Sequence, residues 1–297
     1  MPQRPVVVVI YGTPGTGKTS LACTSENPLL IDTDRGFDRA CERVDTITAT
    51  KWDDFYNSEV LGDDTMAGLV SGYKTIIIDT AKACIDDYLS AFVVSKNYKL
   101  ATNSLKRFGE IGDQFRNFVN QLRAKGNDIV FVCHDKEVLD GDIIRHSPDC
   151  TGQSKDLLVR IADEVGYVCK VNGKRTIVFE PSDTRVGKNA GGLPDMQIPD
   201  CGSADFGGFF ARVIAQVKCA IQSKGEAQRT ALEAIKEARE RLEGCDTAEA
   251  ANELAETAKT LAPVYRKAFC EEMVAALAEK DIILKNKKFV KDEQAAN

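Results

Sequence analysis

Long apolar runs and paired cysteines are both missing from this chain of 297 residues. No stretch of about 18 consecutive apolar residues occurs, which excludes a membrane-spanning helix. The apolar segment 6–10 is too short for a signal peptide. The ten cysteines include no C-x-x-C pair, so the sequence indicates neither a zinc site nor a redox motif. Scattered single cysteines are typical of small buried residues in a reducing compartment. We therefore expect a cytoplasmic protein with no membrane partner.

An excess of positive charge is also missing. The chain has 39 basic and 45 acidic residues, which gives a net charge of −6. Residues 211–297 carry 15 basic and 15 acidic residues, so the whole deficit lies in the first 210 residues. A protein of this composition binds nucleic acid only where it concentrates its positive charge locally. Composition by itself therefore gives no support for nucleic-acid binding.

Short apolar runs alternate with helix-like stretches along the first half of the chain. The runs have the β-branched composition of strands buried on both faces of a parallel sheet. They lie at residues 6–11, 29–31, 75–78 and 129–133. The helix-like stretches lie at residues 52–61, 81–94 and 105–125. This alternation predicts an α/β fold with right-handed crossovers and a mainly parallel central sheet.

Two tight turns interrupt apolar runs further along the chain. Asp140-Gly141-Asp142 separates residues 138–139 from 143–144, and Asn172-Gly173 separates residues 165–171 from 175–179. Turns of this kind between apolar runs predict β-hairpins. The sheet is therefore expected to end in antiparallel strands.

The composition changes again near residue 205. Residues 190–208 are rich in glycine and proline, which is typical of a linker, and a helical periodicity follows from residue 209 to about 280. Asp246, with Glu249 three residues on, predicts a capping box, and Pro263 suits the first turn of another helix. The tail 285–297 is expected to be frayed. We predict a core domain at 1–205 and a small helical C-terminal domain at 206–297.

A complete phosphate-binding motif follows the first predicted strand. The segment Gly12-Thr13-Pro14-Gly15-Thr16-Gly17-Lys18-Thr19 matches G-x-x-x-x-G-K-[ST] and lies between a strand and a predicted helix, as the motif requires. Its glycines let backbone N–H groups turn towards phosphate oxygens. Lys18 supplies charge to the β- and γ-phosphates, and the Thr19 hydroxyl ligates magnesium. The sequence therefore predicts binding of ATP with Mg²⁺, and its hydrolysis.

Three other predicted strands end in polar residues. Asp79 ends the strand 75–78, taken as a neighbour of the P-loop strand, and is expected to hold magnesium through a water. Asp32 and Asp34 follow the second strand, where they can face the nucleotide. We assign Asp34 as the base that activates water, with Asp32 as the alternative. His134 follows the strand 129–133 and is expected to contact the γ-phosphate and report its loss.

These segments occur in RecA-like order. More closely, Asp32-Thr33-Asp34-Arg35-Gly36, His134-Asp135-Lys136-Glu137 and the hairpin up to Thr151-Gly152 resemble phage-encoded RecA-like ATPases. These are the Sak-type single-strand annealing proteins, relatives of the RecA/RadA recombinase core. The likeness covers about residues 4–200. It implies a RecA-like ATP-binding core that forms homo-oligomers on single-stranded DNA, in a bacterial host cell if a phage encodes it. Because Asp34 falls where such proteins carry a longer glutamate, it also implies a slow or DNA-stimulated ATPase.

The resemblance further implies residues that act on a neighbouring subunit and on DNA. Lys188, or Arg185 as second choice, would reach the neighbour's ATP in trans. The segment 94–108 interleaves basic with aromatic residues and has no acid, as suits a single strand of DNA. The segment 135–155, with Lys136, Arg145, His146 and Lys155, is the weaker candidate because it also carries acids. The predicted DNA-binding residues are Lys96, Tyr98, Lys99, Lys106 and Arg107.

Three functions fit these motifs. The first is an ATPase that binds single-stranded DNA and promotes annealing or strand exchange, with ATP as a switch. The second is a regulatory ATPase that recruits a single-strand binding or replication protein through its C-terminal helices, without touching DNA. The third is a P-loop small-molecule kinase, although no arginine-rich lid is evident. Stimulation of ATP hydrolysis by single-stranded DNA separates the first function from the others.

Overall fold

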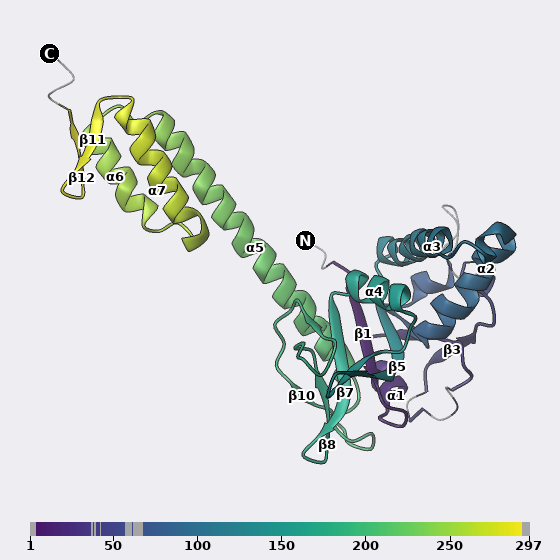
Figure 1. Cartoon of the computed structure of the whole chain (residues 1–297). Helices are drawn as coiled ribbons and strands as arrows, with labels where there is room; N and C mark the ends of the chain where they lie inside the picture. Colours follow the sequence, from purple (N-terminus) through teal and green to yellow (C-terminus); the bar gives the residue numbers. More distant parts are fainter. Residues whose placement is uncertain are drawn as a thin grey trace. The chain divides into compact units, whose positions relative to one another are not determined.

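The computed structural model describes residues 4–36, 38, 40–41, 43–56, 61 and 68–292. The chain divides into two compact units, Met1–Ile221 and Gln222–Asn297, which are coloured along the sequence in Figure 1. Helix α5 (Phe209–Glu243) begins in the first unit and ends in the second. The domain boundary expected between residues 205 and 206 stays a prediction.

A ten-stranded sheet forms the centre of the first unit in the described part of the chain. Its order is β10-β8-β7-β1-β5-β4-β2-β3, with β6 paired to β5 and β9 paired to β7. Neighbouring strands are parallel from β7 to β3, whereas β8 is antiparallel to β7 and β10 to β8. The predicted α/β fold with a mainly parallel sheet is confirmed. The strands are β1 (Val7–Gly12), β2 (Pro28–Asp32), β3 (Asp45–Thr48), β4 (Thr75–Asp79), β5 (Asp128–Asp140), β6 (Ile143–Pro148), β7 (Glu164–Val171), β8 (Lys174–Val178), β9 (Lys188–Asn189) and β10 (Met196–Gln197).

Helices cover both faces of this sheet, and β1 shows why. Val7 and Val9 of β1 join one buried cluster, whereas Val8 and Ile10 join another, since successive strand residues point to opposite faces. The first cluster is closed by α2, α3 and α4, and the second by α1 and the start of α5. These helices are α1 (Lys18–Ala22), α2 (Ser90–Lys96), α3 (Ser104–Ala124) and α4 (Gly152–Ile161), with shorter helical segments at Trp52–Asp54, Leu69–Gly72, Ala83–Leu89 and Tyr98–Ala101.

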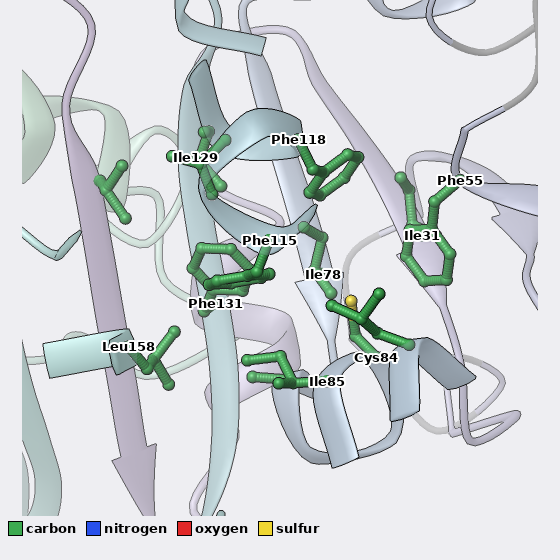
Figure 2. Packing of buried hydrophobic residues seen from close by; sticks show 14 of the residues in the cluster. Ile31, Phe55, Ile78, Cys84, Ile85, Phe115, Phe118, Ile129, Phe131 and Leu158 are labelled. Carbon is green, nitrogen blue, oxygen red and sulfur yellow. The ribbon is translucent and has the colours of Figure 1, made fainter. Parts of the chain in front are cut away.

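Aromatic side chains of α3 fill the first cluster. Phe115 and Phe118 lie over the strands β4 and β5, close to Ile78 and Phe131 (Figure 2). The ring centroids of Phe115 and Phe131 are 5.4 Å apart. Buried aromatic residues contribute large apolar areas. This packing holds β4 and β5 together on the side of the sheet away from α1.

Both predicted hairpins are confirmed. β5 and β6 pair up to Asp140 and Ile143, and β7 and β8 pair up to Val171 and Lys174. The second turn consists of Asn172 and Gly173, with φ of 50° and 78°. Two consecutive positive φ values match the right-handed twist of the strands, and asparagine followed by glycine adopts them at low cost. The local sequence therefore determined both turns.

Three segments differ from the expectation. The linker prediction for 190–208 is wrong, because β10 pairs with β8 and the side chains of Ile198 and Phe206 are buried. Of the predicted helix 52–61, residues Trp52–Asp54 form a single helical turn that ends before Phe55, and residues 57–60 lie outside the described residues. The predicted helix 81–94 exists, but it begins as a π-helix at Ala83–Leu89. The sequence had also not indicated β3 or α4.

The second unit contains the end of α5, α6 (Ala248–Ala258), α7 (Pro263–Ala278) and a hairpin of β11 (Ile282–Lys285) and β12 (Lys288–Lys291). Pro263 stands in the first turn of α7, as predicted. The cap of α6 is Thr247, not Asp246, because the Thr247 hydroxyl accepts the N–H of Ala250. The expectation of a frayed tail is wrong up to residue 292, since Phe289 is buried in this unit; residues 293–297 lie outside the described residues.

Of the helices in the described part of the chain, none combines the length and the apolar character needed to cross a lipid bilayer.

Candidate functional site

The P-loop connects β1 to α1 at the carboxyl edge of the sheet. Gly12 leaves no room for a side chain, because a Cβ there would collide with the carbonyl oxygen of Val168. Gly17 precedes α1 with a left-handed φ of 79°, which glycine adopts without strain. The Lys18 ammonium lies over the loop and donates to the carbonyl oxygens of Gly12 and Thr13, at 2.8 and 2.9 Å. Burial lowers the pKa of Lys18, and the nearby Asp79 carboxylate opposes that shift.

The Thr19 hydroxyl and the Asp79 carboxylate meet at the same edge. Thr19 Oγ1 donates to Asp79 Oδ2 over 2.6 Å. The expectation that their strands are neighbours is wrong, because β5 lies between β1 and β4. The two groups nevertheless meet, since the carboxyl ends of all three parallel strands lie along one edge. A hydroxyl beside a carboxylate is an all-oxygen donor set of the kind that Mg²⁺ prefers, so these residues fit the ion.

The Asp79 carboxyl is shielded from solvent. Burial raises its pKa from 3.8 to about 6, while the hydrogen bond from Thr19 acts in the opposite direction. The negative charges of Asp34 and Asp32 add to the increase. An opposite charge within a few ångströms favours the ionised form of a carboxyl. A divalent cation at this position would therefore hold Asp79 ionised at neutral pH.

Asp34 and His134 lie close together in the P-loop cavity. This cavity has a volume of about 380 Å³, and both side chains line it together with Lys18, Thr19 and Asp79. The distance from His134 Nε2 to Asp34 Oδ2 is 3.9 Å. The two side chains are 44% and 39% exposed, so each remains accessible to a ligand or a water. The structure therefore brings the predicted residues Lys18, Thr19, Asp34, Asp79 and His134 to one cavity.

Asp32 has a different role from Asp34. Its side chain is buried, and its Oδ1 accepts the backbone N–H groups of Asp34 and Gly36 at 3.2 and 3.3 Å. A short acid that binds the N–H two residues further on stabilises a turn. Asp32 thus shapes the loop that presents Asp34, and Asp34 is the acid that lines the cavity.

Arg175 also lines the cavity, although no sequence motif had indicated it. It lies at the start of β8, and its Nη1 is 2.6 Å from the position that a Cβ on Gly17 would occupy. Its Nη2 donates to the carbonyl oxygen of Pro199 over 2.6 Å, which fixes the guanidinium beside the P-loop. No motif marks Arg175, because its place depends on how the β7–β8 hairpin packs beside β1.

The segment 185–189 is held within its own chain. Lys188 belongs to β9, which pairs with β7. Its ammonium donates to the carbonyl oxygens of Val159, Arg160 and Ala162 at the end of α4, at 3.2, 3.2 and 2.5 Å. A lysine in this position satisfies carbonyls that a helix end leaves free. A role for Lys188 in trans would require all three bonds to break, whereas the Arg185 side chain makes one hydrogen bond to the described residues, from Nε to the carbonyl oxygen of Glu180. The role in trans stays a prediction for both residues.

The predicted DNA-binding residues surround the connection from α2 to α3. Tyr98 is 77% exposed, and Lys96, Lys99 and Lys106 are also exposed, whereas Arg107 is half-buried and donates to the carbonyl oxygen of Ala101. Lys96 and Lys106 line a groove of about 730 Å³ that also contains acids. In the weaker candidate segment, the His146 ring binds Asp135 rather than facing outwards.

Together, the parallel sheet, the complete P-loop and the Thr19–Asp79 pair define a nucleotide-binding P-loop ATPase. The sequence model of the AAA domain family matches residues 4–190, and the chain belongs to that family. No curated protein matches the chain.

Proposed function

We propose that this protein hydrolyses ATP with Mg²⁺ and, in its ATP-bound state, assembles on single-stranded DNA to promote annealing or strand exchange. The observation that carries the proposal is the pairing of Asp34 with His134 at 3.9 Å beside the P-loop. That pair supplies a base and a γ-phosphate contact in one cavity. The order of the motifs, which resembles that of phage RecA-like annealing proteins, supports the DNA function.

The residues divide the chemistry of hydrolysis among them. Lys18 and the P-loop amides bind the phosphates, while Thr19 and Asp79 would hold a magnesium ion, which would neutralise the charge on the phosphate oxygens. Asp34 orients and deprotonates the attacking water, which its accessible carboxylate can reach. His134, which lies beside Asp34 in the cavity, contacts the γ-phosphate.

His134 also provides a route from the cavity to the rest of the molecule. It lies within β5, which continues without a break into the β5–β6 hairpin. A contact made or lost at His134 is therefore transmitted along a hydrogen-bonded strand. Because ATP and ADP differ in the γ-phosphate, the two states would differ in the position of the hairpin, and the ATP-bound state would favour assembly.

The α2–α3 connection is the proposed DNA surface. Tyr98 is exposed for stacking on a base, and Lys96, Lys99 and Lys106 surround it with positive charge. We assign the contact with a neighbouring subunit's ATP to Arg185, since Lys188 is held by three carbonyls of its own chain.

ATP hydrolysis with and without single-stranded DNA tests this function, with Lys18→Ala as the blank. We expect a DNA-stimulated rate that disappears in Lys18→Ala. A rate indifferent to DNA would point instead to an ATPase that recruits a replication partner through its second unit. A phosphorylated small molecule among the products would point to a kinase.

Tyr98→Ala separates the DNA contact from the nucleotide site. We expect single-stranded DNA to bind about 5-fold to 100-fold more weakly, because stacking on an aromatic ring contributes about 1–3 kcal/mol per base. Leu105→Ala is the matched control, since Leu105 in the first turn of α3 is 76% exposed, much as Tyr98 is, but has no aromatic ring. Equal affinities of the two variants in a fluorescence anisotropy titration would remove Tyr98 from the DNA surface.

A further inference from the structure

Two acids and a histidine gather on the face of the β5–β6 hairpin opposite to that of His134. Residues alternate between faces along a strand, so Asp135 and Glu137 lie on the face opposite to that of His134. The antiparallel register places His146 of β6 directly opposite Glu137. The donor atoms of Asp135, Glu137 and His146 all lie within 4.8 Å of one another. The second of the chain's two histidines thus belongs to this cluster.

A tyrosine closes the cluster from the neighbouring hairpin. The Tyr167 hydroxyl lies 3.3 Å from Asp135 Oδ2 and 3.2 Å from His146 Nδ1. The Tyr167 ring stacks on the imidazole with centroids 5.0 Å apart. His146 Nδ1 and Asp135 Oδ2 are themselves 2.6 Å apart. One nitrogen and several oxygen donors therefore converge on a small volume between β5, β6 and β7.

The Asp135 carboxylate has more capacity for bonding than the described residues use. Its side chain is only 2% exposed. Oδ2 is shared by His146 and Tyr167, but Oδ1 is buried and has no hydrogen-bond partner among the described residues. A buried carboxylate oxygen without a partner carries the full desolvation cost of a charged group. A cation bound at the cluster would remove that cost.

We propose that Asp135, Glu137 and His146 form a binding site for a divalent transition metal ion, with Zn²⁺ as the best fit. Imidazole nitrogen combined with carboxylate oxygen suits zinc, whereas the hydroxyl and carboxylate near the P-loop suit magnesium. Three protein ligands leave a fourth position for a water or for the Tyr167 hydroxyl. The ion would tie the base of the β5–β6 hairpin to β7. This site is separate from the nucleotide site and does not depend on the proposed DNA function.

Calorimetric titration of the metal-free full-length protein with ZnCl₂ tests the site. Substitution His146→Phe removes the nitrogen ligand and keeps an aromatic ring for stacking on Tyr167, and Glu137→Gln removes an exposed carboxylate charge. We expect the wild type to bind one more Zn²⁺ ion per chain than the His146→Phe variant. Glu137→Gln should lower the affinity of this site for Zn²⁺ at least about 10-fold. Even the loss of a residue that only hydrogen-bonds to a metal ligand lowers metal affinity by about that factor.

Two controls distinguish zinc bound at this site from zinc bound elsewhere on the protein. The chain has free cysteines that can bind zinc, but they are unchanged in His146→Phe and so cancel in the comparison. His134→Asn removes the other histidine and should leave the titration unaltered. If His146→Phe does not fold, Glu137→Gln decides, because that side chain lies on the surface. Identical stoichiometry and affinity in the wild type and Glu137→Gln would overturn the proposal and leave a hydrogen-bonded cluster without metal.

Discussion

At the scale of single residues, Asp34 is the side chain whose loss should affect chemistry but not binding. It lines the cavity, and in the described part of the chain no hydrogen bond joins it to Lys18 or Thr19. For Asp34→Asn we expect kcat for ATP hydrolysis to fall by about 100-fold to 10,000-fold, the usual contribution of a general base. Nucleotide affinity should change little. Steady-state kinetics and a nucleotide-binding titration measure the two effects separately.

Asp140→Asn is the control for this variant. Asp140 lies at the tip of the β5–β6 hairpin, is exposed, and forms an ion pair with Arg145 only at the surface. The same change of charge there should leave kcat unaltered. If Asp34→Asn hydrolysed ATP as fast as Asp140→Asn, the base would have to be sought elsewhere, with Asp32 next.

The Asp79 carboxyl should make the folded protein less stable as the pH rises, which is opposite to the usual effect of an acidic side chain. Its pKa is about 6 in the folded protein and about 3.8 when exposed, so the folded form binds more protons between these values. The contribution of Asp79 to the free energy of unfolding is therefore fully present below pH 3.8, and it is lost as the pH rises through 6. In metal-free protein, the free energy of unfolding should therefore fall by about 2 kcal/mol between pH 4 and pH 7 relative to Asp79→Asn.

Urea denaturation of both proteins at several pH values, with a chelator present, measures this difference. The variant corrects for every other titrating group, because only position 79 differs. A difference that stayed constant from pH 4 to pH 7 would show that Asp79 is not shifted. A wild type that became more stable relative to Asp79→Asn as the pH rose from 4 to 7 would contradict the sign.

At the scale of elements, a buried ion pair attaches α5 to the sheet. Lys218 Nζ lies 2.5 Å from Asp128 Oδ2, and the two side chains are 6% and 2% exposed. Asp128 Oδ1 also accepts the N–H of Val6, so one carboxylate joins β5, β1 and α5. For Lys218→Met we expect a loss of about 3–5 kcal/mol in stability, because the change leaves a buried charge without its partner.

Lys236→Met on the same helix is the matched control. Lys236 pairs with Glu240 at 3.6 Å, but the side chains are 78% and 62% exposed. Pairs of this kind contribute only a few tenths of a kcal/mol in solution. Chemical denaturation should therefore separate the two variants clearly. Equal stability of both would mean that the Asp128 charge is satisfied without Lys218.

At the scale of the whole molecule, the start of α5 should decide whether the nucleotide-binding unit folds alone. Phe210, Val213 and Val217 are buried in the second cluster of the sheet, and Lys218 pairs with Asp128. A fragment ending at residue 205, the domain boundary expected from the sequence, lacks all of them. Each buried side chain of this size contributes about 1.5–3 kcal/mol, so we expect fragment 1–205 to be several kcal/mol less stable than fragment 1–221.

Urea unfolding of the two fragments measures this difference. Fragment 1–221 should also keep ATP hydrolysis, because every residue of the cavity lies within it. A fragment 1–205 as stable as the longer one would place the boundary where the composition of the sequence changes. Retained hydrolysis without DNA stimulation in 1–221 would assign the DNA response to the second unit.

The sequence by itself determined the features that depend on a few consecutive residues. The P-loop follows from glycines that permit the required backbone, and the β7–β8 turn from Asn172 and Gly173. β-branched runs determined the buried strands, and their polar ends pointed to Asp34, Asp79 and His134. The class of fold and several residues of the P-loop cavity could therefore be predicted from the sequence.

Tertiary structure decided whatever depends on strand order and packing between distant segments. Asp79 reaches Thr19 across an intervening strand, and Arg175 reaches Gly17 from a hairpin more than a hundred residues away in the chain. Residues 190–208 have a linker composition, yet they join the sheet because β8 leaves backbone groups for β10 to pair with. Lys188 looked free for a neighbour, but the carbonyls at the end of α4 hold it. Contacts between distant segments are formed only when the sheet is assembled, so no local pattern of residues records them.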